Sequence, residues 1–233
     1  MSSRILLVLS NHVVSGPDAQ PVGFRLHEIT QALHIWDAAG ITTDFASPLG
    51  GEVVPEIPAF QLQDRINKRY HDDPLFRSRL HNTLPMNRVH PRAYQGVYVV
   101  GSAGALWDLP NCMQLQSVLA DAYAHGAILA AIRFGVSAFK HVVLPNGSPL
   151  LEGKTITAPS RGEIRFIGLD RVLPFIPEDD FRAQGISYHK RFIPLLPNVR
   201  ISERLITGQN AASVRPLARL LLKTMQLQER EEV

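Results

Sequence analysis

The sequence contains one cysteine, Cys112, among 233 residues, so the chain cannot form an internal disulfide bond. No apolar run reaches the roughly 18 residues that a membrane-spanning helix needs. The first residues also lack the basic start, long apolar run and small-residue cleavage site of a secretory signal peptide. Together these absences predict a cytoplasmic protein in a reducing environment, with no membrane partner.

The composition also lacks the marks of a disordered or nucleic-acid-binding chain. Hydrophobic residues make up 45% of the sequence and charged residues 19%, so an ordinary core can form. The net charge of +3 is local, because residues 61–92 contain seven Lys or Arg against three Asp. Almost no aromatic residues interrupt this basic segment, whereas single-stranded nucleic-acid sites stack bases on aromatic side chains. We therefore predict a basic helical insertion at about 57–92 with a solvated face, and no nucleic-acid partner.

Apolar periodicity predicts alternating strands and helices. Residues 4–10 form a continuous apolar run, which is typical of a strand buried on both faces of a parallel sheet. Residues 24–39 carry apolar side chains at helical spacing and end at Gly40, and residues 41–46 form a second strand. This β-α-β order predicts parallel strands joined by a right-handed crossover.

The same alternation continues along the chain. We predict strands over 96–100, 127–132 and 199–206, and helices over 111–125 and 209–228. An Asn-Gly turn within 144–157 predicts a hairpin. The pattern therefore predicts a single doubly wound α/β domain, with a mostly parallel sheet sandwiched by helices.

Ligand sites in such a sheet lie beyond the carboxyl ends of the strands. Three of these ends are distinctive: the helix start that carries Glu28, the G-S-A-G run at 101–104, and the turn at Arg133 directly after the 127–132 strand. A sharp strand-to-helix turn of the last kind exposes the nucleophile of α/β hydrolases. Arginine stays protonated and offers no nucleophile, so the residue at this turn cannot attack a substrate.

We predict no metal and no cofactor. The G-S-A-G run is too short for a dinucleotide-binding fingerprint and lacks its third glycine. His27 and His34 share a helical face, but a metal site needs further ligands and supporting partners that this spacing does not provide.

Several blocks of the sequence, in the right order, resemble the ThiJ/PfpI superfamily, and most of all its stress-chaperone and glutathione-independent glyoxalase III branch. The likeness runs from Ile5 to about Leu222. It includes G-F-R-L-H-E at 23–28, D-F-A-S-P-L-G-G at 44–51 and L-I-T-G-Q-N-A-A-S at 205–213. The resemblance implies a flavodoxin-like fold over a single domain, residues 1–233, with a class I glutamine-amidotransferase-like topology, and it implies a homodimer.

The catalytic motifs of that family are changed in this chain. Where active members read approximately A-V-C-H-G, this chain reads A-I-R-F-G, which puts Arg133 at the cysteine position and Phe134 at the histidine position. The family's G-G-H-G loop corresponds to G-S-A-G here. The resemblance places Glu28 at the glutamate that approaches the nucleophile, and Glu163 at the acidic residue of the Cys-His-Asp/Glu triad. Cys112 matches no nucleophile position.

A guanidinium in place of a thiol favours an ionised carboxylate partner. We therefore hypothesise that Arg133 forms a partly buried ion pair with Glu28, with Glu163 as the second candidate. If a pocket remains, Ser102, Ala103 and Phe134 are the expected ligand-binding residues, since their backbone lies at the two strand ends.

Three functions stay open at this stage. The leading prediction is a pseudoenzyme that binds a small anionic or carbonyl compound, or a protein partner. The alternative is an enzyme of altered mechanism, a lyase, hydratase or isomerase acting on a small carbonyl compound, with Glu28 or Glu163 as base and Arg133 holding the anion. The third, implied by the resemblance, is a holdase chaperone, which requires an exposed apolar patch.

Overall fold

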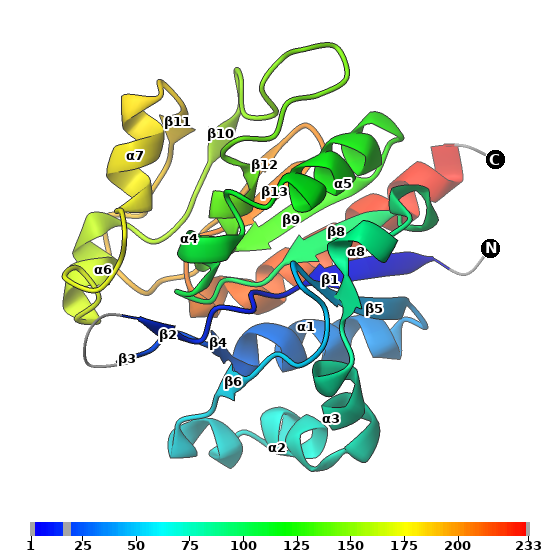
Figure 1. The fold of residues 1–233 in the computed structure, drawn as a ribbon, viewed down its shortest axis with the longest axis vertical. Coiled ribbons are helices and arrows are strands. Elements are labelled where there is room, and N and C mark those ends of the chain that lie inside the picture. Colours follow the sequence, from blue (N-terminus) through cyan, green and yellow to red (C-terminus); the bar gives the residue numbers. More distant parts are fainter. Residues whose placement is uncertain (1–2, 16–19, 232–233) are drawn as a thin grey trace.

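A seven-stranded sheet forms the centre of the computed structural model, which describes residues 3–15 and 20–231 (Figure 1). The strand order is β12-β13-β9-β8-β1-β5-β7. The strands span Val199–Ser202, Leu205–Gly208, Ile128–Ile132, Gly96–Val99, Arg4–Val8, Thr42–Ser47 and Leu84–Pro85, in that order. All neighbours are parallel except β12 and β13. The mostly parallel, doubly wound sheet predicted from the sequence is confirmed.

Side chains of β1 alternate between two separate cores. Ile5 and Leu7 belong to the cluster on one face of the sheet, and Leu6 and Val8 belong to the cluster on the other. All four are fully buried. A strand covered on both faces needs apolar residues at every position, which explains the continuous apolar run.

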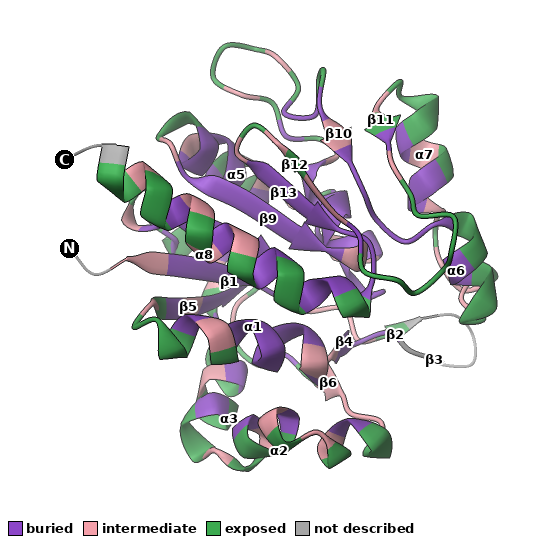
Figure 2. Cartoon of the chain, turned by 180° about the vertical axis from the view of Figure 1, so that it is seen from behind, coloured by how far each residue is buried: buried purple, intermediate pink, exposed green. Residues whose placement is uncertain are grey.

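Helices cover both faces of the sheet. Helices α1 (Leu26–Ala38) and α8 (Val214–Glu231) lie on one face, and α4 (Ala105–Asp108) and α5 (Met113–Ala124) lie on the other (Figures 1 and 2). Trp36 on α1 joins the first pair, because its Nε1 donates to the Ala218 carbonyl of α8 at 3.1 Å. Within residues 3–15 and 20–231, no helix is both long and apolar enough to cross a bilayer.

The segment predicted as a basic insertion folds as short helices beside α1. It contains α2 (Arg65–Asp72) and α3 (Pro74–His81), each begun by an aspartate whose side chain accepts backbone N–H bonds. Its later part adds β7 to the edge of the central sheet, paired with β5. The 3₁₀ turns of the segment are η1 (Ala59–Gln63), η2 (Met86–Arg88) and η3 (Pro91–Ala93).

On the side of the sheet where β8 and β9 end lie α6 (Arg161–Phe166) and α7 (Pro177–Ala183), at the left of Figure 1. The described part of the chain also contains three two-stranded pairs. They are β10 (Thr155–Ile156) with β11 (Ser187–Tyr188), β2 (Val14–Ser15) with β3 (Gln20–Pro21), and β4 (Phe24–Arg25) with β6 (Pro55–Glu56). The 3₁₀ turns η4 (Arg133–Phe139) and η5 (Ala211–Ser213) follow β9 and β13.

Two sequence-based predictions of strands were wrong. The 144–157 hairpin reduces to one isolated antiparallel bridge between Val143 and Pro149, because β10, in its expected second half, pairs in parallel with β11 instead. The single 199–206 strand is the antiparallel pair β12 and β13. Its turn at Glu203 has a φ of 54° without glycine, and Tyr123 Oη donates to the Glu203 carboxylate at 2.8 Å. This distant contact holds a turn that has no local sequence signal.

Candidate functional site

The turn after β9 is strained and tightly packed. Arg133 has a φ of 51°, in the left-handed region that costs a non-glycine residue about 1–2 kcal/mol. A Cβ on Gly101 would lie 2.1 Å from the Ile132 carbonyl oxygen, and one on Gly135 would lie 2.6 Å from the Val99 oxygen. The ends of β8 and β9 therefore approach so closely that both positions require glycine. The sharp turn predicted at Arg133 is present.

Arg133 forms an ion pair with Glu28, the acidic residue in the first turn of α1. Its Nη1 donates to Glu28 Oε1, and the two side chains are 13% and 0% exposed. The Arg133 guanidinium also lies 5.1 Å from the centre of the Phe134 ring. The hypothesised pair is thus formed with the first of its two candidate partners. The second oxygen of Glu28, Oε2, is buried and has no hydrogen-bond partner among the residues that the structure describes.

Glu163 is occupied by other groups. It is buried at the third position of α6, where it completes a capping box with Ser160. Its Oε2 accepts from Ser160 N at 3.0 Å and Gln209 Nε2 at 2.6 Å, and its Oε1 accepts from Leu195 N and Asn210 Nδ2, both at 2.9 Å. This carboxylate anchors the loop that contains Leu195 to the end of the sheet.

The three predicted ligand-binding residues lie in the wall behind the turn. Ser102 is buried, and its Oγ accepts from Ala105 N at 3.1 Å. Ala103 and Phe134 belong to a small apolar cluster with Leu106 and other buried residues. Among the described residues, these three are absent from the lining of the cavity described next. Their role in binding stays a prediction.

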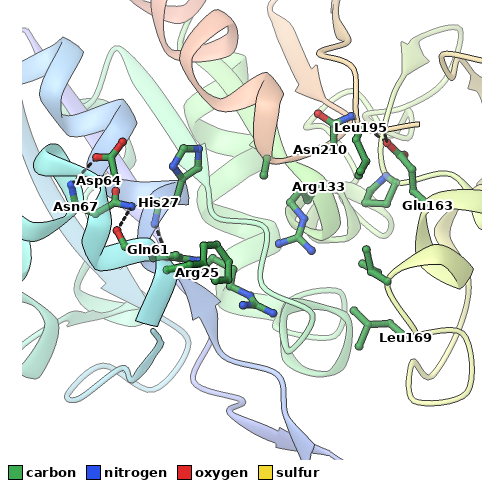
Figure 3. A pocket seen from close by; sticks show the side chains of 14 residues that line it. Arg25, His27, Gln61, Asp64, Asn67, Arg133, Glu163, Leu169, Leu195 and Asn210 are labelled. Atoms are coloured by element: carbon green, nitrogen blue, oxygen red, sulfur yellow. Dashed lines mark hydrogen bonds between the residues drawn. The ribbon is translucent and has the colours of Figure 1, made fainter. Parts of the chain in front are cut away.

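A cavity of about 560 Å³ opens in front of Arg133. Figure 3 shows the guanidinium groups of Arg133 and Arg25 pointing into the space between two walls. One wall is polar and comes from α1 and the insertion, with His27, Gln61, Asp64 and Asn67. The other wall is largely apolar and comes from the segments around α6 and before β12, with Pro159, Ile167, Leu169 and Leu195.

The polar wall is held in place by its own hydrogen bonds. Asp64 begins α2 and accepts from Asn67 N at 3.0 Å and from Gln31 Nε2 at 3.1 Å. These bonds, the one from the Asn67 backbone above all, lower the pKa of Asp64. Gln61 Oε1 accepts from His27 N at 3.2 Å. The wall is therefore a fixed set of polar groups.

His27, which lines the cavity, and Glu56, the partner of Arg25, also have shifted pKa values. Burial lowers the pKa of His27 from 6.5, although the Glu28 charge and a hydrogen bond to the Ala211 backbone oppose the shift. His27 is therefore predominantly neutral at pH 7. Arg25 pairs with Glu56 at 3.0 Å, and burial raises the pKa of Glu56 against the opposing charges of Arg25 and Arg133. Each guanidinium at the cavity thus has one carboxylate partner.

Sequence reasoning missed most of the cavity lining. Arg25 and His27 stand in the same block as Glu28, so their helix-start position was the available signal, whereas Asp64 and Asn67 gave none. His34 is exposed and lies apart from the cavity that His27 lines. Cys112 is half-buried before α5 and is likewise not one of the described residues that line the cavity.

Known proteins resemble this chain along nearly its whole length. A probable glutathione-independent glyoxalase of Saccharomyces cerevisiae, SNO4, is 30% identical over 223 residues, which cover 90% of this chain and 92% of the yeast protein. The chain belongs to the Hsp31 family of glutathione-independent glyoxalases. The yeast family member HSP31, a glutathione-independent glyoxalase, is 26% identical over 225 residues, covering 92% and 94% of the two chains. No family model matches the chain.

Solved structures agree with this placement. The Rapid Encystment Protein 24 kDa of Francisella tularensis superposes with a TM-score of 0.88 at 27% identity, over 96% of this chain and 99% of that one. Glyoxalase III of Candida albicans superposes with a TM-score of 0.85 at 21% identity, over 95% and 96% of the two chains. Both structures therefore share the fold of this chain over nearly its whole length.

Proposed function

We propose that this family member binds a small carboxylate or carbonyl compound through Arg133 and does not carry out cysteine-dependent glyoxalase chemistry. The observation that carries the proposal is the guanidinium of Arg133, which stands at the strained turn after β9, is paired with Glu28 and faces the cavity. An arginine in this position supplies hydrogen-bond donors where a nucleophile would otherwise stand.

The chemistry of the only cysteine supports the loss of the glyoxalase reaction. A thiol acts as a nucleophile as its thiolate, beside a base and within reach of the substrate. Cys112 precedes α5, and its Sγ lies 3.8 Å from Gln114 Oε1. Neither residue is among the described residues that line the cavity.

Arg133 and Arg25 together define the kind of ligand. A guanidinium has five N–H donors, and Arg133 uses Nη1 on Glu28. Glu28 and Glu56 each pair with one of the two guanidinium groups, and the carboxylates of Asp64 and Glu163 also line the cavity, so the site offers hydrogen-bond donors without excess positive charge. This balance favours a ligand with a single negative charge, or a polarised carbonyl, over a phosphate dianion.

Two measurements on the purified protein test the proposal. We expect no consumption of methylglyoxal above background, and we expect sodium lactate or acetate to raise the melting temperature relative to sodium chloride at equal ionic strength. Arg133→Met should abolish the ligand-dependent shift. Arg165→Met is the matched control, because Arg165 is exposed on α6 and does not line the cavity. Methylglyoxal turnover by the unmodified protein would reject the proposal.

His27 supports a second candidate, an enzyme of altered mechanism. Glu28 has no exposed surface, but His27 lines the cavity as a neutral imidazole with one ring nitrogen bonded to the Ala211 backbone. Its other nitrogen would accept the proton next to a substrate carbonyl, while Arg133 holds the resulting enolate oxygen. Exchange of the carbon-bound protons of dihydroxyacetone in D₂O, lost in His27→Gln with the fold intact, would establish this reaction class.

The holdase and homodimer expectations can each be tested directly. Among the exposed apolar side chains, Phe192 is 99% exposed and Phe166 is also on the surface. A holdase would use such residues to delay aggregation of heat-unfolded citrate synthase, and Phe192→Ser should reduce that effect. Sedimentation velocity measures whether two copies associate.

A further inference from the structure

The size of the cavity exceeds what a three-carbon carbonyl compound requires. Its volume of about 560 Å³ falls within the range of pockets that enclose ligands of drug-like size, roughly 300–1,000 Å³. The guanidinium groups of Arg133 and Arg25 point into the space between the two walls, and the cavity continues along the apolar wall (Figure 3). A ligand that fills the site must therefore extend beyond the group held by Arg133.

The apolar wall, opposite the insertion, indicates the chemistry of the part of the ligand that extends beyond Arg133. Ile167, Leu169, Leu195 and Pro159 present hydrocarbon to the cavity. Ile167 and Leu195 are 41% and 48% exposed, and Phe60 at another edge of the cavity is 64% exposed. Large apolar side chains grouped around an opening, with arginines inside, form an amphiphilic site.

Leu195 lies beside the cavity in a strained backbone conformation. Its φ is 63°, which a leucine adopts only where the surroundings impose it. Its N–H donates to the buried Glu163 carboxylate at 2.9 Å, and the next carbonyl, of Leu196, accepts from Asn210 Nδ2 at 2.8 Å. The buried polar network beneath the loop thus fixes an apolar side chain at the cavity.

We infer that the ligand is an amphiphilic monocarboxylate, whose carboxylate binds the free N–H groups of Arg133 and whose hydrocarbon tail lies on Ile167, Leu169 and Leu195. The inference rests on the proposed function and adds the tail. The head group is limited to one negative charge, because Glu28, Glu56, Asp64 and Glu163 leave the cavity without the excess positive charge that would hold a dianion.

Isothermal titration calorimetry with sodium acetate, butanoate, hexanoate and octanoate tests the inference at neutral pH. We expect the dissociation constant to fall by about twofold to fourfold for each added methylene group, until the tail reaches the opening. Hexan-1-ol, with the same tail and no charge, should bind at least about tenfold more weakly than hexanoate, because it lacks the charge-assisted hydrogen bonds to Arg133.

Matched variants locate the tail. Leu169→Asn should weaken hexanoate binding by about tenfold and leave acetate binding unchanged. Leu75→Asn is the control, since Leu75 is exposed on α3 and does not line the cavity, and it should alter neither affinity. Circular dichroism confirms that each variant is folded before titration.

The outcomes separate this inference from the proposed function. Equal affinity for all four acids would overturn the amphiphilic ligand while leaving the carboxylate site intact. Failure of every acid to bind the unmodified protein would overturn both. Hexan-1-ol binding as tightly as hexanoate would overturn the assignment of the carboxylate to Arg133.

Discussion

Arg133 donates to Glu28 across 105 positions of the chain, and the pair joins the turn after β9 to the first turn of α1. The carboxylate has no exposed surface, whereas the guanidinium lines the cavity. The arginine therefore stabilises a buried charge on one side and offers hydrogen-bond donors to a ligand on the other.

Removing one partner of this ion pair should destabilise the folded protein. We expect Arg133→Ala to lower the free energy of unfolding by about 3–5 kcal/mol, because it leaves Glu28 buried without a counter-charge. The double variant Arg133→Ala with Glu28→Gln should recover part of that loss. Urea denaturation of the two single variants and the double variant gives the coupling energy, and a coupling near zero would mean that the pair does not exist in solution.

Glu163 should act on the loop that carries Leu195. In Glu163→Ala, three buried donors and the partly buried N–H of Leu195 lose their acceptor, and each loss of a buried partner costs about 1–3 kcal/mol where no water replaces it. We expect faster hydrogen–deuterium exchange at Leu195 and lower stability. Glu152→Ala, on an exposed surface, is the control. Unchanged exchange at Leu195 would show that Glu163 does not anchor the loop.

His27 should make the protein less stable in mild acid. Burial, the largest cause, lowers its pKa below 6.5, and the Arg215 charge adds to this, while Glu28, Asp64 and the Ala211 backbone oppose it. The folded state then binds fewer protons than the unfolded chain, so its contribution is present above pH 6.5 and is lost as the pH falls towards the folded pKa.

Denaturation at several pH values measures this contribution. The free energy of unfolding should decline less between pH 7 and pH 5 in His27→Gln than in the unmodified protein. His34→Gln should behave like the unmodified protein, because His34 is exposed on the same helix. Identical slopes in all three proteins would contradict the assignment.

Restoring a thiol at the turn should not restore glyoxalase activity. Arg133→Cys places a cysteine next to Phe134, which is fully buried in an apolar cluster and supplies no base. We expect methylglyoxal consumption to stay at background. Activity in this variant would show that another group, such as His27, can activate a thiol there.

The sheet and its main helices could be predicted from sequence because their apolar periodicity reflects burial directly. Ile5 through Leu9 are fully buried, and α1 ends close to the predicted Gly40. The β12–β13 hairpin could not be predicted, since its turn depends on the contact between Tyr123 and Glu203. Local pattern carries no information about such a contact.

Some residues of the candidate site could likewise be predicted from the sequence, and others could not. Glu28 and Arg133 could be paired in advance because both follow strand ends that meet at one edge of the sheet. Asp64 and Asn67 could not, because Gln31 and Thr30 bring them to the cavity through bonds across more than thirty positions. Glu163 fits a capping-box pattern in sequence, but its bonds to Leu195 and Asn210 depend on the fold.

A crystal structure of the protein soaked in sodium hexanoate tests the central claim most directly. The account predicts Arg133 on Glu28, with the carboxylate within hydrogen-bond distance of the remaining Arg133 nitrogens and the tail against Leu169 and Leu195. An Arg133 side chain turned out into solvent, with the cavity empty or the acid bound elsewhere, would contradict it.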